Sequence, residues 1–425
     1  DGERRLAFAD QLSLFEAIGV VLSQTADNTE ATDAVIQSLC AGLNNILQNN
    51  DNNLTPDVAS TLLAQHINAI AMFSKGFSLR RGLDSGSRRS RRNSTGSSSD
   101  SESDVPRDIN AIEAAYSPIF QNALGAVLEA RRVAAGSEEV RSAVTSSLHI
   151  IVNTLGAALP DHLPAIFETC AIEASPRDLV DFTRLLSQLI VTFGEQMRAP
   201  LASLLSGLLS GLMRGYEEGM AAAGGDGAVG GVRSELRREV EELRRAIYSL
   251  VYSVAASGCT DVLLADSLQA VFPLLLEGIE ADDTNIQKAA CSTILILMKA
   301  WIGNVAAPGA AGSDDGLSAF VYGQSVGAGA RAVLANAVQR KSSGAPLDAT
   351  FAGAVQDIGA LHQLLLQAHG LAAINEIGRQ LVGVGVPEEM VSEYCTALAP
   401  LANGSARDAR RLLITFADAF AEAQQ

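Results

Sequence analysis

The chain has 425 residues, of which 48% are apolar, and a formal net charge of −17. A chain of this length is too long to fold around one compact hydrophobic core, and its apolar content excludes general disorder. Because Lys and Arg provide most of the affinity for phosphate backbones, the acidic balance excludes a general nucleic-acid binder and leaves room only for a local basic patch. Aromatic residues make up 5%, and β-branched residues rarely alternate with polar ones, so we predict an all-helical chain.

The first expected helix contains a glycine. In the stretch QLSLFEAIGVVLSQ at 11–24, Leu12, Phe15, Gly19 and Leu22 recur at steps of three and four and therefore share one helical face. A glycine inside a helix costs about 1 kcal/mol relative to alanine. We therefore expect a second helix to approach closely at Gly19.

Helix starts recur along the chain. Thr55 before Pro56 is typical of an N-cap followed by a first-turn proline, and Ser175 with Asp178 resembles a capping box. We expect about sixteen helical segments joined by short turns. With no strand signal and no strict repeat, this pattern predicts an α-solenoid of antiparallel HEAT-like helix pairs, wound as a right-handed superhelix whose curved surface binds a large partner.

Three low-complexity stretches are expected to interrupt the array. The first is rich in Arg, Ser and Gly and has almost no apolar residue to bury, and the other two are rich in Gly. The expected order is HEAT-like helices over 1–79, a disordered Arg/Ser-rich insertion over 80–108, helices over 109–220, a Gly-rich loop over 221–232, helices over 233–302, a Gly-rich loop over 303–316 and C-terminal helices over 317–425.

No residue pattern predicts an enzyme, a metal site or a cofactor. The five cysteines lie far apart without a CxxC pair, which predicts buried, reduced thiols in an intracellular protein. The histidines lack metal-ligand spacing such as HExxH. The stretch GAGARAV at 327–333 has neither a preceding strand nor the third glycine of a phosphate-binding loop. The uncharged window at 199–213 is too short to cross a bilayer, so we expect no membrane insertion.

Arginine clusters are the candidate phosphate surface, because the planar guanidinium suits bidentate phosphate contacts. The RNA-binding candidates are Arg80, Arg81, Arg131, Arg132, Arg237, Arg238, Arg244 and Arg245. An alternative stays open for the last four. They alternate at helical spacing with Glu235, Glu239, Glu241 and Glu242, as in a solvated helix whose charges pair with one another.

The Arg/Ser-rich insertion also carries candidate phosphorylation sites. Ser90 and Ser94 each follow an arginine pair, and Ser99 and Ser101 each have an acidic residue three positions later. The negative charge of phosphates at these serines would oppose the positive charge of the neighbouring arginines. A flexible linker, a nuclear-import signal and an RNA-binding arm are the other interpretations of this insertion.

Several stretches resemble the tRNA exportins (exportin-t) of the importin-β superfamily. They are LSLFEAIGVVLSQ at 12–24, SGCTDVLL from 257, NIQKAACSTILILMKAW at 285–301, FVYGQSV from 320, and VPEEMVSEYCTALA at 386–399 followed by the helix around 412–420. The likeness is collinear over nearly the whole chain except the three low-complexity stretches. The 80–104 segment is longer and richer in Arg and Ser than is expected of the family.

The resemblance implies a HEAT-repeat receptor without catalytic activity. Such a receptor binds mature tRNA together with Ran-GTP in the nucleus, passes nuclear pore proteins, releases the tRNA in the cytoplasm and shuttles between the two compartments. It reads RNA shape mainly through backbone and sugar. The resemblance covers roughly the C-terminal half of such a protein, without the principal Ran-binding helices, so we expect a fragment. A HEAT scaffold that binds only proteins and an exportin for another cargo stay open as alternatives.

Overall fold

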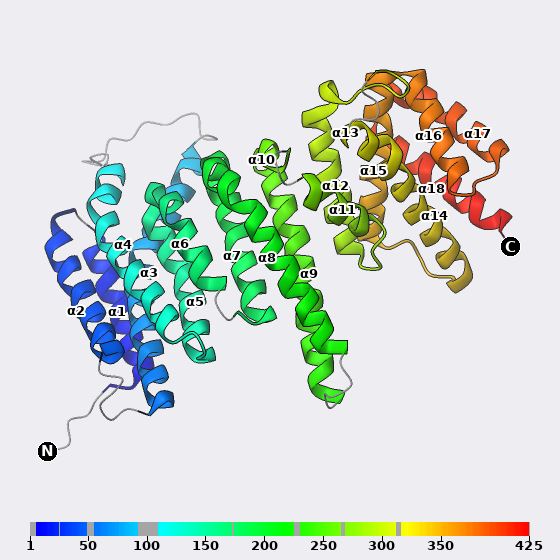
Figure 1. Cartoon of the computed structure of the whole chain (residues 1–425). Helices are drawn as coiled ribbons and strands as arrows, with labels where there is room; N and C mark the ends of the chain where they lie inside the picture. The colour runs from blue at the N-terminus through cyan, green and yellow to red at the C-terminus, as the bar shows by residue number, and fades with distance from the viewer. Residues whose placement is uncertain are drawn as a thin grey trace, which may run out of the picture. The chain divides into compact units, whose positions relative to one another are not determined.

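The structure is a computed structural model and describes residues 6–24, 26–48, 55–91, 109–171, 174–224, 230–264, 268–311 and 316–424. Every regular element within these ranges is helical, and none of these residues lies in a strand (Figure 1). Within each compact unit, neighbouring helices pack side by side and are joined by short connections, which confirms the prediction of an all-α solenoid. The chain divides into two compact units, Asp1–Leu185 and Leu186–Gln425.

The first unit is built from two rows of helices. α3 packs against α1 and α5, while α4 packs against α2 and α6. The apolar interior includes Ile67, Phe73, Phe120 and Leu148. The elements are α1 (Phe8–Leu22), a 3-10 turn (Ala26–Asn28), α2 (Thr29–Gln48), α3 (Pro56–Arg91), α4 (Ile109–Val133), α5 (Glu138–Leu155), a second 3-10 turn (Gly156–Ala158), α6 (Leu159–Ala171) and α7 (Pro176–Phe193), which contains the division between the units.

The second unit continues with longer helices. α9, α12, α15 and α18 pack one after another, and α8, α11 and α14 pack beside them. The elements are a 3-10 turn (Gly194–Met197), α8 (Arg198–Gly224), α9 (Gly230–Ala256), α10 (Thr260–Leu264), α11 (Leu268–Ile279), α12 (Thr284–Trp301), a 3-10 turn (Ile302–Asn304), α13 (Gly316–Ser318), a π-helical stretch (Ala319–Ser325), α14 (Val326–Ser343), α15 (Ala349–His369), α16 (Leu371–Gly383), α17 (Glu388–Leu398), a 3-10 turn (Ala399–Asn403) and α18 (Ala406–Ala423).

The close approach expected at Gly19 is confirmed. A Cβ added to Gly19 would lie 2.2 Å from the carbonyl oxygen of Phe73 in α3. The same contact has a second glycine, because a Cβ added to Gly76 would lie 2.3 Å from the backbone nitrogen of Val20. Two glycines thus allow the backbones of α1 and α3 to touch, which offsets the cost of placing glycine inside a helix.

The two helix starts expected from the sequence are also confirmed. α3 begins at Pro56, and the Ala59 N–H donates to the Thr55 carbonyl oxygen at 3.0 Å. At the start of α7, the Asp178 N–H donates to Ser175 Oγ at 3.2 Å, and the Ser175 N–H donates to Asp178 Oδ2 at 2.9 Å. These two reciprocal bonds are a capping box.

Two interruptions begin or end at other residues than expected. α3 continues to Arg91, where the sequence suggested an insertion without secondary structure from residue 80. Extending a formed helix adds one hydrogen bond per residue without a new nucleation cost, and arginine is a good helix former. α8 and α9 also extend into the expected loop at 221–232. Residues 92–108 and 225–229 lie outside the described residues, so the expectation for them stays a prediction.

Two further expectations concern single segments. Residues 327–333 form part of α14, in keeping with the exclusion of a phosphate-binding loop there. In the ranges that the structure describes, no helix is both long enough and apolar enough to span a bilayer.

Candidate nucleic-acid interface

Four of the predicted arginines lie along α9, which packs against α8 and α12. Arg237 and Arg238 are exposed to solvent in the N-terminal half of the helix. Arg244 and Arg245 lie two turns further on, where α9 meets its neighbours. The two pairs therefore have different surroundings although they share one helix.

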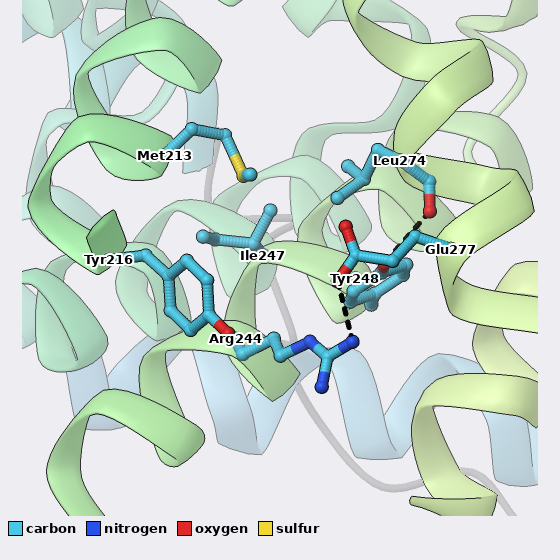
Figure 2. A pocket seen from close by; sticks show the side chains of 7 residues that line it. All are labelled: Met213, Tyr216, Arg244, Ile247, Tyr248, Leu274 and Glu277. Atoms are coloured by element: carbon cyan, nitrogen blue, oxygen red, sulfur yellow. Dashed lines mark hydrogen bonds and ion pairs between the residues drawn. The ribbon is translucent and has the colours of Figure 1, made fainter. Parts of the chain in front are cut away.

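Arg244 reaches across to α11. Its Nη2 donates to Glu277 Oε1 at 2.7 Å, and 19% of its side chain is exposed (Figure 2). Burial disfavours the charged guanidinium, but Tyr216 and Glu277 more than compensate, so the pKa of Arg244 lies above its ordinary value. Arg244 is a charged link between two packed helices.

The pocket around Arg244 is small. It is lined by Met213, Tyr216, Arg244, Ile247, Tyr248, Leu274 and Glu277 (Figure 2). Its volume of about 10 Å³ has room for roughly one water molecule and no nucleotide. Contact with a large ligand at this position would therefore use the surface of the helices and not this cavity.

Tyr248 fixes the contact between α9 and α11. Its hydroxyl donates to the Leu274 carbonyl oxygen at 2.7 Å, and burial raises the pKa of this tyrosine well above its ordinary value. A Cβ added to Gly278 would lie 2.3 Å from Cε1 of the Tyr248 ring. Glycine at 278 thus leaves room for the Tyr248 ring beside α11.

Arg245 binds the turn that follows α11. Its Nε donates to Asp283 Oδ2, while Asp283 Oδ1 accepts from the backbone N–H of Asn285 at 2.8 Å and caps α12. Burial by itself raises the pKa of Asp283, but the hydrogen bonds from Arg245 and Asn285 outweigh it and hold this pKa below its ordinary value. The Asp283 carboxylate therefore serves the cap and the ion pair at once.

A third arginine binds the same acidic segment. Arg331 in α14 donates through Nε to Glu280 Oε1 at 2.8 Å. The segment 277–283 between α11 and α12 thus receives arginines from α9 and from α14. Arg244 and Arg245 thus form ion pairs with carboxylates of this segment, a pairing that the sequence did not suggest.

The predicted arginines of the first unit differ from one another. Arg131 is only 2% exposed, and its Nη1 donates to the Ala135 carbonyl oxygen at 3.3 Å, just beyond the end of α4. Burial and this hydrogen bond engage Arg131 within the protein, and its contact with a phosphate stays a prediction. Arg132 is 43% exposed and lies 3.6 Å from Glu129. It remains a candidate.

The remaining predicted residues lie at or beyond the end of α3. Arg80, Arg81 and Ser90 belong to the described backbone of this helix. Ser94, Ser99 and Ser101 lie outside the described residues. The structure therefore brings together only the four arginines of α9 and leaves the insertion candidates as predictions.

The comparison with known proteins decides the family. The Exportin-T family model matches residues 1–420. The chain belongs to the Exportin-T family. This membership confirms the resemblance found in the sequence, and Exportin-T proteins are transport receptors rather than enzymes.

Curated relatives of this Exportin-T chain occur in plants and fungi. Exportin-T of Arabidopsis thaliana is 27% identical over 169 residues, which cover 39% of this chain and 17% of the relative. Exportin-T of Mycosarcoma maydis is 23% identical over 405 residues, 93% of this chain and 33% of the relative. Exportin-T of Aspergillus oryzae is 24% identical over 419 residues, which cover 94% of this chain and 37% of the relative. The chain thus spans about a third of the length of the two fungal relatives.

The cysteines of the Exportin-T chain are poor nucleophiles. Burial raises the pKa of Cys40 to about 11 and that of Cys170 and Cys291 to about 12, so these thiols are protonated at neutral pH. All five cysteines are free thiols. In the part of the chain that the structure describes, no group of His, Cys, Asp and Glu side chains could hold a metal ion.

One arginine cluster was missed by the sequence reasoning. Arg407, Arg410 and Arg411 lie in the first turns of α18, at spacings of three and four residues. The signal was present, since the stretch SARDARR places three arginines directly after a helix-capping serine. This short cluster lies between the apolar segments of α17 and the rest of α18.

Proposed function

We propose that this chain is part of a nuclear export receptor for tRNA. In this proposal the receptor binds tRNA together with Ran-GTP in the nucleus, contacts nuclear pore proteins during passage and releases the tRNA in the cytoplasm. It would therefore shuttle between nucleus and cytoplasm. The match of the Exportin-T family model over residues 1–420 is the observation that carries the proposal.

The surface of α9 is suited to such a cargo. Exposed arginines bind RNA phosphates without reading bases, and A-form RNA is recognised mostly through its shape and backbone. Arg237 and Arg238 are exposed, while the ion pairs of Arg244 and Arg245 hold α9 firmly against α11 and the start of α12. A rigid helix presents its charges at lower entropic cost than a mobile one.

The acidic balance of the chain is compatible with this role. A net charge of −17 favours association with a basic protein surface and disfavours binding of RNA away from the arginines. A receptor that holds Ran-GTP and tRNA at once needs both kinds of surface.

A receptor for a protein cargo is the second candidate. The ion pairs of Arg244 and Arg245 with Glu277 and Asp283 favour it, because they engage two of the four α9 arginines within the protein. This alternative predicts that the chain binds tRNA no better than an unrelated RNA.

The proposal can be tested in the cells that contain the protein. The protein is depleted, and the distribution of mature tRNA is followed by in-situ hybridisation. We expect tRNA to accumulate in the nucleus while polyadenylated RNA stays normally distributed. An unchanged distribution of tRNA after full depletion would contradict the proposal, and nuclear accumulation of one protein species instead would support the second candidate.

A further inference from the structure

The N-terminal turns of α18 carry three positive charges on one face. Arg407, Arg410 and Arg411 are separated by three and four residues, so their side chains are neighbours on the helix surface. Arg407 and Arg411 are exposed, and Arg410 is partly buried. The carboxylate within this group belongs to Asp408, which is bonded to Ser405 Oγ at 2.6 Å in a capping box.

The arrangement is electrostatically unfavourable for the helix. Like charges three and four residues apart repel one another, and cations at a helix N-terminus oppose the helix dipole. Among the described residues, none of the three arginines forms an ion pair with a carboxylate within 4.0 Å. Asp408 offsets part of the charge, but its carboxylate is directed to the cap.

Other cations of the second unit are placed differently. Lys288 lies 2.6 Å from Asp357, Arg340 lies 2.6 Å from Asp418, and Lys341 lies 2.8 Å from Glu422. Each of these pairs joins two helices. The acidic C-terminal end of α18 thus forms ion pairs with the cations of α14. Among the described residues, the basic N-terminal end of α18 forms no such ion pair with a neighbouring helix.

The backbone around Arg410 is held tightly. A Cβ added to Gly359 in α15 would lie 3.1 Å from the Arg410 nitrogen, so the two helices are close at this point. Arg410 Nε is buried and has no hydrogen-bond partner in the described part of the chain. Packing against α15 thus fixes the backbone from which the Arg410 side chain extends, which lowers the entropy lost on binding a ligand.

We propose that Arg407, Arg410 and Arg411 form an RNA-binding surface, which we call the α18 arginine surface, and that it contacts phosphates of the RNA backbone. Guanidinium groups bind phosphate oxygens in a bidentate manner, and a polyanion would relieve both the mutual repulsion and the opposition to the helix dipole. The identity of the RNA as tRNA rests on the proposed function. The binding itself is expected to be independent of base sequence.

The test compares the purified wild-type chain with the double variant Arg407→Gln/Arg411→Gln. The control is Arg379→Gln, which also removes an exposed arginine of the second unit, but one that is paired with Glu376. Affinities for labelled tRNA and for an unrelated RNA duplex are measured over a series of salt concentrations. Melting temperatures are recorded for all three proteins.

We expect the double variant to bind both RNAs more weakly. The slope of log affinity against log salt should fall by about 1.5, because two fewer phosphates are neutralised. The double variant should melt at the same temperature as wild type or higher, since repulsion is removed. The control should keep the wild-type slope.

The outcomes separate this proposal from the proposed function. An unchanged slope in the double variant, with wild-type tRNA binding, overturns the α18 arginine surface and leaves the function intact. Loss of binding to both RNAs in the double variant, with no preference of wild type for tRNA, supports the surface and counts against tRNA as cargo. A wild-type chain that binds neither RNA overturns both proposals.

Discussion

Gly19 of α1 faces Gly76 of α3 with no side chain between the two backbones. A Cβ at either position would enter the backbone of the other helix, at 2.2 Å from Phe73 O or 2.3 Å from Val20 N. Backbone atoms cannot move aside as the end of a flexible side chain can. The spacing between α1 and α3 therefore depends on both glycines.

Replacing Gly19 with leucine should destabilise the first unit by about 1 to 3 kcal/mol, because the larger side chain overpacks this contact. Thermal or urea unfolding measures the change. The matched control is Gly207→Ala in α8, where an added Cβ meets nothing within 4 Å. This control should raise stability by about 0.5 to 1 kcal/mol, since it only removes the glycine penalty. Equal stability of the Gly19 variant and wild type would refute the backbone contact.

Substitution of Asp283 should lower the stability of the chain through two separable contributions, the cap of α12 and the ion pair with Arg245. Asp283→Ala removes both the cap of α12 and the partner of Arg245 and should cost about 1 to 2 kcal/mol. Asp283→Asn keeps an acceptor for the Asn285 N–H and loses the charge, so we expect a smaller loss. Urea unfolding of the two variants side by side measures the difference. Two equal losses would mean that the cap contributes nothing.

The contribution of the Asp283 charge should depend on pH. Its pKa is lowered in the folded chain, so the stabilisation is present above the unfolded pKa of about 3.9 and is lost as the pH falls through the folded value. The stability difference between wild type and Asp283→Asn should therefore be constant near neutral pH and shrink below about pH 4. A difference that grows in acid would contradict the lowered pKa.

Buried His362 should make the second unit sensitive to mild acid. Its Nδ1 lies 2.9 Å from the Tyr394 hydroxyl, and burial lowers its pKa to about 4. The unfolded chain binds a proton near pH 6.5 and the folded chain does not, so stability should fall from about pH 6.5 towards pH 4, by up to roughly 3 kcal/mol. In His362→Leu this part of the pH dependence should disappear. Identical pH profiles for the two proteins would count against a neutral, buried histidine.

The sequence predicted features whose causes are local. Pro56 and the Ser175–Asp178 box mark helix starts because capping depends on residues within one turn. Gly19 indicated a close contact because the free-energy cost of a glycine inside a helix had to be offset. Its partner Gly76 could not be predicted, since only packing brings α1 and α3 together.

The candidate site shows the same limit. The spacing of Arg244 and Arg245 from the glutamates of α9 is a local property, and it suggested pairing within one helix. Glu277 and Asp283 also reach these arginines, because α11 and the start of α12 pack beside α9. The burial of Arg131 likewise follows from how the end of α4 is covered, which no sequence spacing encodes.

The two arginine pairs of α9 should respond differently to charge reversal. Arg237→Glu/Arg238→Glu removes two exposed charges and should weaken tRNA binding, lower the salt slope by about 1.5 or more, and leave the melting temperature nearly unchanged. Arg244→Glu/Arg245→Glu places like charges beside Glu277 and Asp283, so its main effect should be lower stability. If the two double variants lost stability and RNA affinity equally, the distinction between exposed and paired arginines would be wrong.

The most direct measurement of the central claim is the affinity of the protein for tRNA with and without Ran-GTP, using protein isolated in its natural length from its own cells. We expect Ran-GTP to strengthen tRNA binding, tRNA to strengthen Ran-GTP binding by the same factor, and Ran-GDP to have no effect. An affinity for tRNA that equals the affinity for an unrelated RNA duplex, and that Ran-GTP does not change, would contradict the account.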